Sequence, residues 1–154
     1  MVSILFVCHG NICRSPMAEF VMKDKVRRAG LEDQFEIDSA ATSTEEIGNP
    51  VYPPVREVLR NHGVPYGNRV ARQMDADDYV CYDHIICMDG NNMRNLGRIC
   101  KGDPDRKVGL LMDLTDRPGD VADPWYTRDF ETAWADIDKG CQSILDFILR
   151  GDIR

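Results

Sequence analysis

The chain has 154 residues, of which 43% are hydrophobic and 29% are charged, a composition typical of one globular domain over residues 1–154. Nineteen Lys and Arg against 26 Asp and Glu leave a formal charge of −7, which argues against nucleic acid or an anionic membrane as the main partner. No apolar run is long enough to span a membrane, and the first residues lack the basic start of a signal peptide. We therefore expect a cytoplasmic protein.

Apolar runs typical of buried strands alternate along the chain with amphipathic segments typical of helices. The predicted strands are 3–7, 35–40, 84–88 and 107–111. The predicted helices are 15–29, 55–61, a short turn at 74–80, 91–99 and 130–149. This alternation predicts an α/β fold, a three-layer sandwich with a small parallel sheet between helices.

Six cysteines are spread along the chain without the spacing of a zinc site or of a disulfide-rich secreted fold. They lie at positions 8, 13, 81, 87, 100 and 141. A chain of this length can bury a hydrophobic core and does not need disulfide bonds. We therefore expect reduced thiols that mostly pack in the core, and no resident metal.

The loop after the first predicted strand has the features of an anion-binding site. It reads Cys8-His9-Gly10-Asn11-Ile12-Cys13-Arg14-Ser15, and Pro16 follows. Ligands of parallel α/β sheets bind beyond the carboxyl ends of the strands, and this loop leads into a helix N-terminus whose N–H groups favour anions. Ser15 and Pro16 are predicted to be the N-cap and first residue of that helix.

The residue types in this loop suit phosphate chemistry. Gly10 gives the backbone freedom to turn, and Arg14 can hold two phosphoryl oxygens through its planar guanidinium. Cys8 is expected at the bottom of the loop, where the same dipoles and the Ser15 hydroxyl stabilise its thiolate. The loop is therefore predicted to hold a sulfur nucleophile against a bound phosphate.

The spacing Cys-x5-Arg is weak evidence by itself, because the chain contains it twice. The second copy is Cys100-Lys101-Gly102-Asp103-Pro104-Asp105-Arg106. No buried strand precedes it, two aspartates inside it would repel phosphate, and lysine follows it. We predict that this second copy is a surface loop.

With these motifs in view, the chain resembles the low-molecular-weight protein tyrosine phosphatase family. The matching segments are 7–19, 38–40, 62–64, 71–73, 82–83, 87–89 and 123–126. The resemblance implies a four-stranded parallel sheet of order 2-1-3-4. It also implies hydrolysis of phosphotyrosine in proteins through a phosphocysteine, without metal or cofactor, releasing inorganic phosphate. We expect a mostly monomeric protein with weak self-association.

The resemblance also assigns roles that the residues alone leave open. Asp123 becomes the general acid, although by itself it could be only an anchor of the last helix; Asp116, Asp120 and Asp129 are treated as solvated or helix-start charges. Supporting roles beside the loop fall to Asn11, Ser39 and His62. By residue type alone these three are a turn residue, a small strand-end residue and a helix C-cap.

Further expectations concern the surroundings of the nucleophile. Cys13 could form a reversible disulfide with Cys8 under peroxide, or simply fill the helix start. Trp125 and Tyr126 are expected to form an aromatic wall beside the substrate ring. On the opposite side, Glu45 and its neighbour Glu46 either select substrates with basic neighbours or are solvated charges.

Three other functions compete with this interpretation. Related enzymes that hydrolyse phosphoarginine carry threonine where this chain has Ile12, and isoleucine suits a phenyl ring better. Arsenate reductases of the same fold use a redox cysteine pair, which Cys81 and Cys87 could imitate. A binding module without catalysis would keep the loop but lose Cys8 or Asp123, and both are present.

Overall fold

The computed structural model describes residues 1–151, so positions 152–154 of the predicted domain lie outside the described residues. Four strands form one parallel sheet of order β2-β1-β3-β4, which confirms the predicted order. The strands are β1 (Val2–Cys8), β2 (Phe35–Ala41), β3 (His84–Cys87) and β4 (Val108–Leu110). All four predicted strands are present, and no strand end is shifted by more than one residue.

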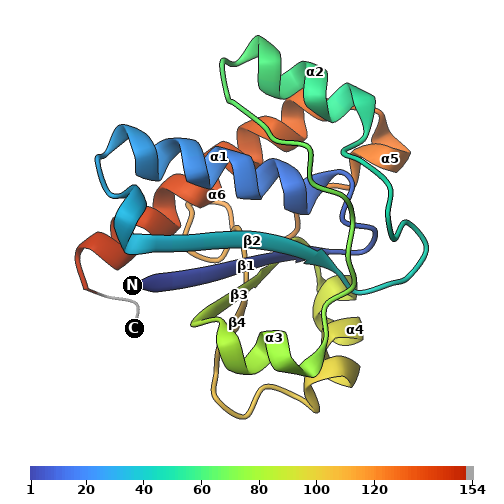
Figure 1. Cartoon of the computed structure of the whole chain (residues 1–154), viewed down its shortest axis with the longest axis vertical. Coiled ribbons are helices and arrows are strands. Elements are labelled where there is room, and N and C mark those ends of the chain that lie inside the picture. Colours follow the sequence, from blue (N-terminus) through green and yellow to red (C-terminus); the bar gives the residue numbers. More distant parts are fainter. Residues whose placement is uncertain (152–154) are drawn as a thin grey trace.

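Helices cover both faces of the sheet, as the three-layer prediction requires (Figure 1). On one face lie α1 (Arg14–Arg28), α2 (Pro53–Asn61) and α6 (Phe130–Leu149); on the other lie α3 (Ala76–Cys81) and α4 (Gly90–Cys100). A 3-10 turn (Glu32–Gln34) and the one-turn helix α5 (Pro124–Thr127) were not predicted. A single turn has no apolar periodicity to detect. No helix within residues 1–151 is long and apolar enough to cross a membrane.

The central strand β1 explains the continuous apolar run at the start of the chain. Ile4 and Phe6 belong to the core under α1 and α6, whereas Leu5 and Val7 belong to the core on the opposite face. Successive strand residues point to opposite faces, so a strand covered on both sides needs apolar residues throughout. The strand is thereby fixed at the centre of the sheet, and the loop at its carboxyl end is fixed with it.

Candidate active site

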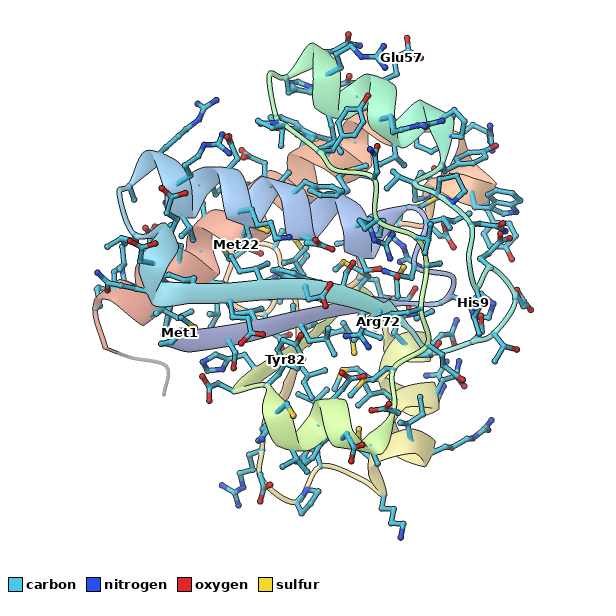
Figure 2. The ribbon with its side chains drawn as sticks, viewed as in Figure 1. Met1, His9, Met22, Glu57, Arg72 and Tyr82 are labelled. Atoms are coloured by element: carbon cyan, nitrogen blue, oxygen red, sulfur yellow. The ribbon has the colours of Figure 1, made fainter. Side chains whose placement is uncertain are left out.

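A cavity of about 230 Å³ lies at the carboxyl ends of the strands. Its walls come from the loop after β1, the segment after β2 and the segment around the start of α5. Figure 2 labels His9 at this edge of the molecule. The lining residues are Cys8, His9, Gly10, Ile12, Cys13, Arg14, Glu45, Glu46, Asp123, Trp125 and Tyr126. Most of the residues predicted for the site therefore meet in one cavity.

Cys8 is the last residue of β1, and its thiol is 3.0 Å from the hydroxyl of Ser15. The backbone N–H of Ser15 also donates to the sulfur, at 3.4 Å. The prediction that Ser15 caps α1 is wrong. The helix begins at Arg14 after Cys13, without a side-chain cap, because the Ser15 hydroxyl bonds to the sulfur instead of to the helix backbone.

Asn11 fixes the shape of the loop from inside. Its φ of 60° lies in the left-handed region, where the prediction had placed the conformational freedom at Gly10. The amide nitrogen of Asn11 donates to Ser15 Oγ at 2.8 Å and to Ser39 Oγ at 3.0 Å. Ser39 in turn donates to the buried carboxylate of Glu19 at 2.6 Å. The positions predicted for Asn11 and Ser39 beside the loop therefore agree with the structure.

Arg69 completes this support, and no motif in the sequence indicates it. Its guanidinium donates to the carbonyl oxygen of Asn11 at 2.8 Å and to the side-chain oxygen of the same residue. The backbone N–H of Arg72 donates to that side-chain oxygen at 3.2 Å. Since these donors occupy the amide oxygen, the amide nitrogen of Asn11 must face the two serines.

His62, predicted to support the loop, lies in a different part of the molecule. Its ring stacks on Trp134 with centroids 3.5 Å apart, and its Nε2 is 2.8 Å from a carboxylate oxygen of Glu131. It is the C-cap of α2 and joins that helix to α6. This geometry corrects the prediction, because the position beside Asn11 belongs to Arg69.

Arg14 is a buried cation held from two sides. Its Nη1 donates to Asp89 Oδ2 at 2.8 Å and to the carbonyl of Val121 at 2.7 Å. Its Nη2 is 3.4 Å from Asp123 Oδ2. Burial lowers the pKa of Arg14, but the negative charges of Cys8, Asp123 and Asp89 outweigh burial and raise it. The guanidinium therefore stays charged and is held in place by Asp89, which lies in the matching segment 87–89 but has no predicted role.

Asp123 lies in extended backbone directly before α5 and caps that helix through the N–H of Trp125, at 3.0 Å. The competing aspartates have other partners. Asp116 pairs with a lysine at 3.2 Å, Asp120 accepts a backbone N–H, and Asp129 caps α6. Among these four carboxylates, Asp123 is the one that lines the cavity.

The two walls of the cavity differ in character. Trp125 packs on Tyr52 with ring centroids 5.0 Å apart, and Tyr126 is 81% exposed, so aromatic surface stands on one side. On the other side, His9 Nε2 is 2.8 Å from Glu45 Oε2. The apolar side chain of Ile12 also lines the cavity.

All six cysteines are free thiols, and only Cys81 is exposed. Cys13 lines the cavity with Cys8, and burial first, then the charges of Cys8 and Asp123, raise its pKa to about 12. Cys13 is thus a neutral thiol at pH 7, and its redox role stays a prediction.

Cys81 and Cys87 lie toward opposite ends of the sheet. The carbonyl of Cys81 is 3.5 Å from the hydroxyl of Ser3, whereas Cys87 is in register with Val7. Four residues of strand separate those two positions by about 13 Å. The geometry therefore does not place them as the redox pair of a reductase. Within residues 1–151, no group of three His, Cys, Asp or Glu side chains is arranged to hold a metal ion.

A family model described as low molecular weight phosphotyrosine protein phosphatase matches residues 3–151. The chain belongs to this family. Low molecular weight protein-tyrosine-phosphatase YfkJ of Bacillus subtilis is 38% identical over 147 residues, 94% of each chain. Low molecular weight phosphotyrosine protein phosphatase of Homo sapiens is 38% identical over 153 residues, again 94% of each. The chain is accordingly a cysteine-based protein tyrosine phosphatase.

Solved structures support this assignment of the fold. The crystal structure of YfkJ from Bacillus subtilis matches with a TM-score of 0.94 and 37% identity, covering 98% of this chain and 96% of that one. The crystal structure of DARP, drosophila arginine phosphatase, matches with a TM-score of 0.87 and 29% identity, covering 94% and 96%. An enzyme described as an arginine phosphatase therefore shares this fold.

Proposed function

We propose that Cys8 is the nucleophile and Asp123 the general acid in a two-step hydrolysis of phosphotyrosine. The sulfur of Cys8 attacks phosphorus in line, the sulfur–phosphorus bond forms and the bond to the tyrosyl oxygen breaks. Asp123 gives its proton to that departing oxygen, so that tyrosine leaves as a neutral phenol. The enzyme is left with a phosphocysteine and an ionised Asp123.

The second step regenerates the thiolate. Asp123 takes a proton from water, the water oxygen bonds to phosphorus, and the sulfur–phosphorus bond breaks to release inorganic phosphate. Arg14 and the N–H groups of the loop stabilise the non-bridging oxygens in both steps. Ser15 donates its hydroxyl to the sulfur as it leaves, because Asn11 already donates to the oxygen of Ser15.

The observation that carries this proposal is the meeting of a thiol, a guanidinium and a carboxylate in one cavity. Asp123 is more than 100 residues away from Cys8 and Arg14 in the chain, yet all three line the cavity. The aromatic wall formed by Trp125 and Tyr126 gives a phenyl ring a surface to contact.

We further propose that residues 1–154 act as one catalytic unit in the cytoplasm, mostly as a monomer with weak self-association. Free thiols throughout the described chain suit a reducing compartment. Size-exclusion chromatography with light scattering at several concentrations tests the oligomeric state, and a stable dimer at micromolar concentration would contradict it.

Trapping the covalent intermediate is the direct test of the chemistry. With para-nitrophenyl phosphate, whose leaving group needs no proton, Asp123→Ala should still form the phosphocysteine but hydrolyse it slowly. Rapid denaturation and mass spectrometry should then find one phosphoryl group on Cys8. A phosphoryl group elsewhere, or loss of turnover of phosphotyrosine peptides on adding a metal chelator, would contradict the proposal.

A further inference from the structure

One wall of the cavity carries two carboxylates that the proposed chemistry does not use. Glu45 and Glu46 line the cavity together with Cys8 and Asp123. A phosphate monoester carries up to two negative charges, so carboxylates at the entrance repel the reacting group of every substrate. The repulsion is offset only for a substrate that brings positive charge to the same wall.

Hydrogen bonds fix the segment that carries these carboxylates to the phosphate loop. The N–H and the hydroxyl of Ser43 both donate to the carbonyl of His9, at 3.1 and 2.9 Å. The N–H of Glu45 donates to the hydroxyl of Ser43 at 3.4 Å. A Cβ at Gly10 would lie 3.3 Å from Cγ of Glu46, so the loop leaves little space beside that side chain. The segment that carries the two carboxylates is therefore held against the phosphate loop.

The present partners of both carboxylates are easily replaced. The contact between Glu45 and His9 joins side chains that are 68% and 49% exposed, and an exposed pair of this kind is weak. Glu46 accepts a hydrogen bond from the neutral amide of Asn49, at 2.6 Å. A guanidinium or ammonium group from a ligand can contact either carboxylate more strongly than these partners do.

The wall around α5 carries one carboxylate, Asp123, which is 3.4 Å from the guanidinium of Arg14 and is paired with it. Arg128, the C-cap of α5, follows this wall, with its guanidinium 5.5 Å from the ring of Tyr52 and 5.3 Å from that of Phe130, and it donates to the Tyr52 hydroxyl at 3.1 Å. The entrance is therefore asymmetric, with aromatic rings and a cation on one side and two carboxylates on the other.

We propose that Glu45 and Glu46 select phosphotyrosine substrates that carry arginine or lysine beside the phosphotyrosine. The inference rests on the proposed function, because the phosphate must lie between Cys8 and Arg14 for the flanking residues to pass this wall. The bound phosphate fixes the phenyl ring in the cavity, and the neighbouring side chains of the peptide then extend over the entrance. The substrate class is thus a phosphotyrosine in a basic sequence.

Matched phosphotyrosine peptides test this selectivity. Each set has one sequence with arginine, alanine or glutamate placed in turn on either side of the phosphotyrosine, and kcat/KM is measured at low and high salt. At low salt the best arginine peptide should exceed its glutamate counterpart by about three- to tenfold, and the ratio should shrink at high salt.

Variants test whether Glu45 and Glu46 cause the ratio of kcat/KM between arginine and glutamate peptides. Glu45→Gln with Glu46→Gln should bring the ratio close to one, and Glu45→Lys with Glu46→Lys should invert it. Glu57→Gln, on the exposed surface of α2 (Figure 2), should keep the wild-type ratio. These comparisons use ratios within one variant, so a general change of activity does not affect them.

The outcomes separate the selectivity from the function beneath it. Equal rates for arginine and glutamate peptides in the wild type, or a ratio unchanged in the double glutamine variant, would overturn the selectivity and leave the phosphatase function intact. Turnover of a phosphoarginine peptide without turnover of any phosphotyrosine peptide would overturn both.

Discussion

Two segments of this chain share the spacing Cys-x5-Arg and have different structures. In the first, Cys8 ends the central strand and Arg14 begins α1, and both residues are almost completely buried. In the second, Cys100 ends α4, and the residues after it lie largely on the surface before β4. The same spacing therefore gives an anion-binding loop only between a buried strand and a helix N-terminus.

The difference extends to the backbone N–H groups. The second segment has its own carboxylate, Asp103, which accepts from the N–H of Lys107 at 2.8 Å and of Val108 at 3.2 Å, and from the hydroxyl of Tyr79 at 2.6 Å. The backbone N–H groups of this segment that could bind an external anion therefore donate to Asp103 instead. In the first loop, Arg69 and the two serines contact the side chain and carbonyl of Asn11, and no carboxylate within residues 1–151 accepts from the backbone N–H groups of residues 9–13.

Substituting each cysteine by serine should give the largest contrast in kcat between the two segments. Cys8→Ser should lower kcat for para-nitrophenyl phosphate by at least about 10³-fold, because a serine hydroxyl is a far weaker nucleophile here than a thiolate. Cys100→Ser should keep wild-type kcat. Steady-state kinetics at pH 6 to 7 measures both, and comparable losses in the two variants would remove the distinction between the segments.

The second largest contrast is expected between Asp123, which lies in the cavity with the first segment, and Asp103, which belongs to the second. Asp123→Ala is expected to lower kcat/KM, which reports the first step alone, by about 10²- to 10⁴-fold for phosphotyrosine through loss of the general acid, and much less for para-nitrophenyl phosphate. Asp103→Asn should leave both rates unchanged. An equal loss of kcat/KM on both substrates in Asp123→Ala would exclude it as the acid for the leaving group.

The two arginines provide a third contrast. Arg14→Lys keeps the charge but loses the planar pair of donors, and kcat should fall by about 10²- to 10³-fold. Arg106→Lys, on the exposed segment, should change nothing measurable. Phosphate inhibition should weaken in the first variant alone, and wild-type affinity for phosphate in Arg14→Lys would show that the guanidinium geometry is unimportant.

The succession of residues along the chain made the sheet and the positions of Cys8 and Arg14 predictable. The sheet followed from alternating apolar runs and amphipathic segments, and Cys8 and Arg14 followed from a strand, a glycine-containing loop and a helix in succession. The choice between the two Cys-x5-Arg copies needed only the residues next to them. Asp123 was different, because the resemblance rather than the residue pattern distinguished it from its neighbours.

Contacts between residues far apart in the sequence were not predictable from the residues next to them. Arg69 lies in a segment without helix or strand, 58 positions from Asn11, and nothing in its immediate sequence indicates that it holds the loop. The resemblance alone places His62 beside the loop, and the structure instead makes it the C-cap of α2, joined to α6, as its residue type predicts. A side chain that contacts a residue so distant in the sequence is identified from the folded structure and not from a motif.

Arg69 distinguishes the first loop from the second in a further way, and its effect should be about tenfold. Arg69→Met removes two hydrogen bonds to Asn11, so the N–H groups of the loop should be less well ordered for phosphate. We expect lower kcat/KM and weaker phosphate inhibition, with partial rescue in Arg69→Lys. Arg60→Met, which removes an exposed contact with Tyr66, is the matched control. A fall in melting temperature without weaker phosphate inhibition would indicate a purely structural role.

The smallest contrast concerns stability, and it belongs to the second segment. Burial raises the pKa of Asp103, but hydrogen bonds from Tyr79 and from the N–H groups of Lys107 and Val108 outweigh burial and lower the pKa below its ordinary value of 3.8. A carboxylate with a lowered pKa stabilises the fold above the unfolded-state pKa, and this stabilisation is lost as the pH falls through the folded-state value.

Asp103→Asn should therefore lower the free energy of unfolding by about 1 kcal/mol at pH 7, through weaker hydrogen bonds. The difference from wild type should shrink below pH 4. Urea titrations across this range measure the difference, and one that stays constant with pH would mean that the charge of Asp103 does not stabilise the segment. Because catalysis does not use Asp103, kcat at pH 7 should not change. One copy of the spacing would then contribute to stability through its carboxylate, and the other to catalysis through its sulfur.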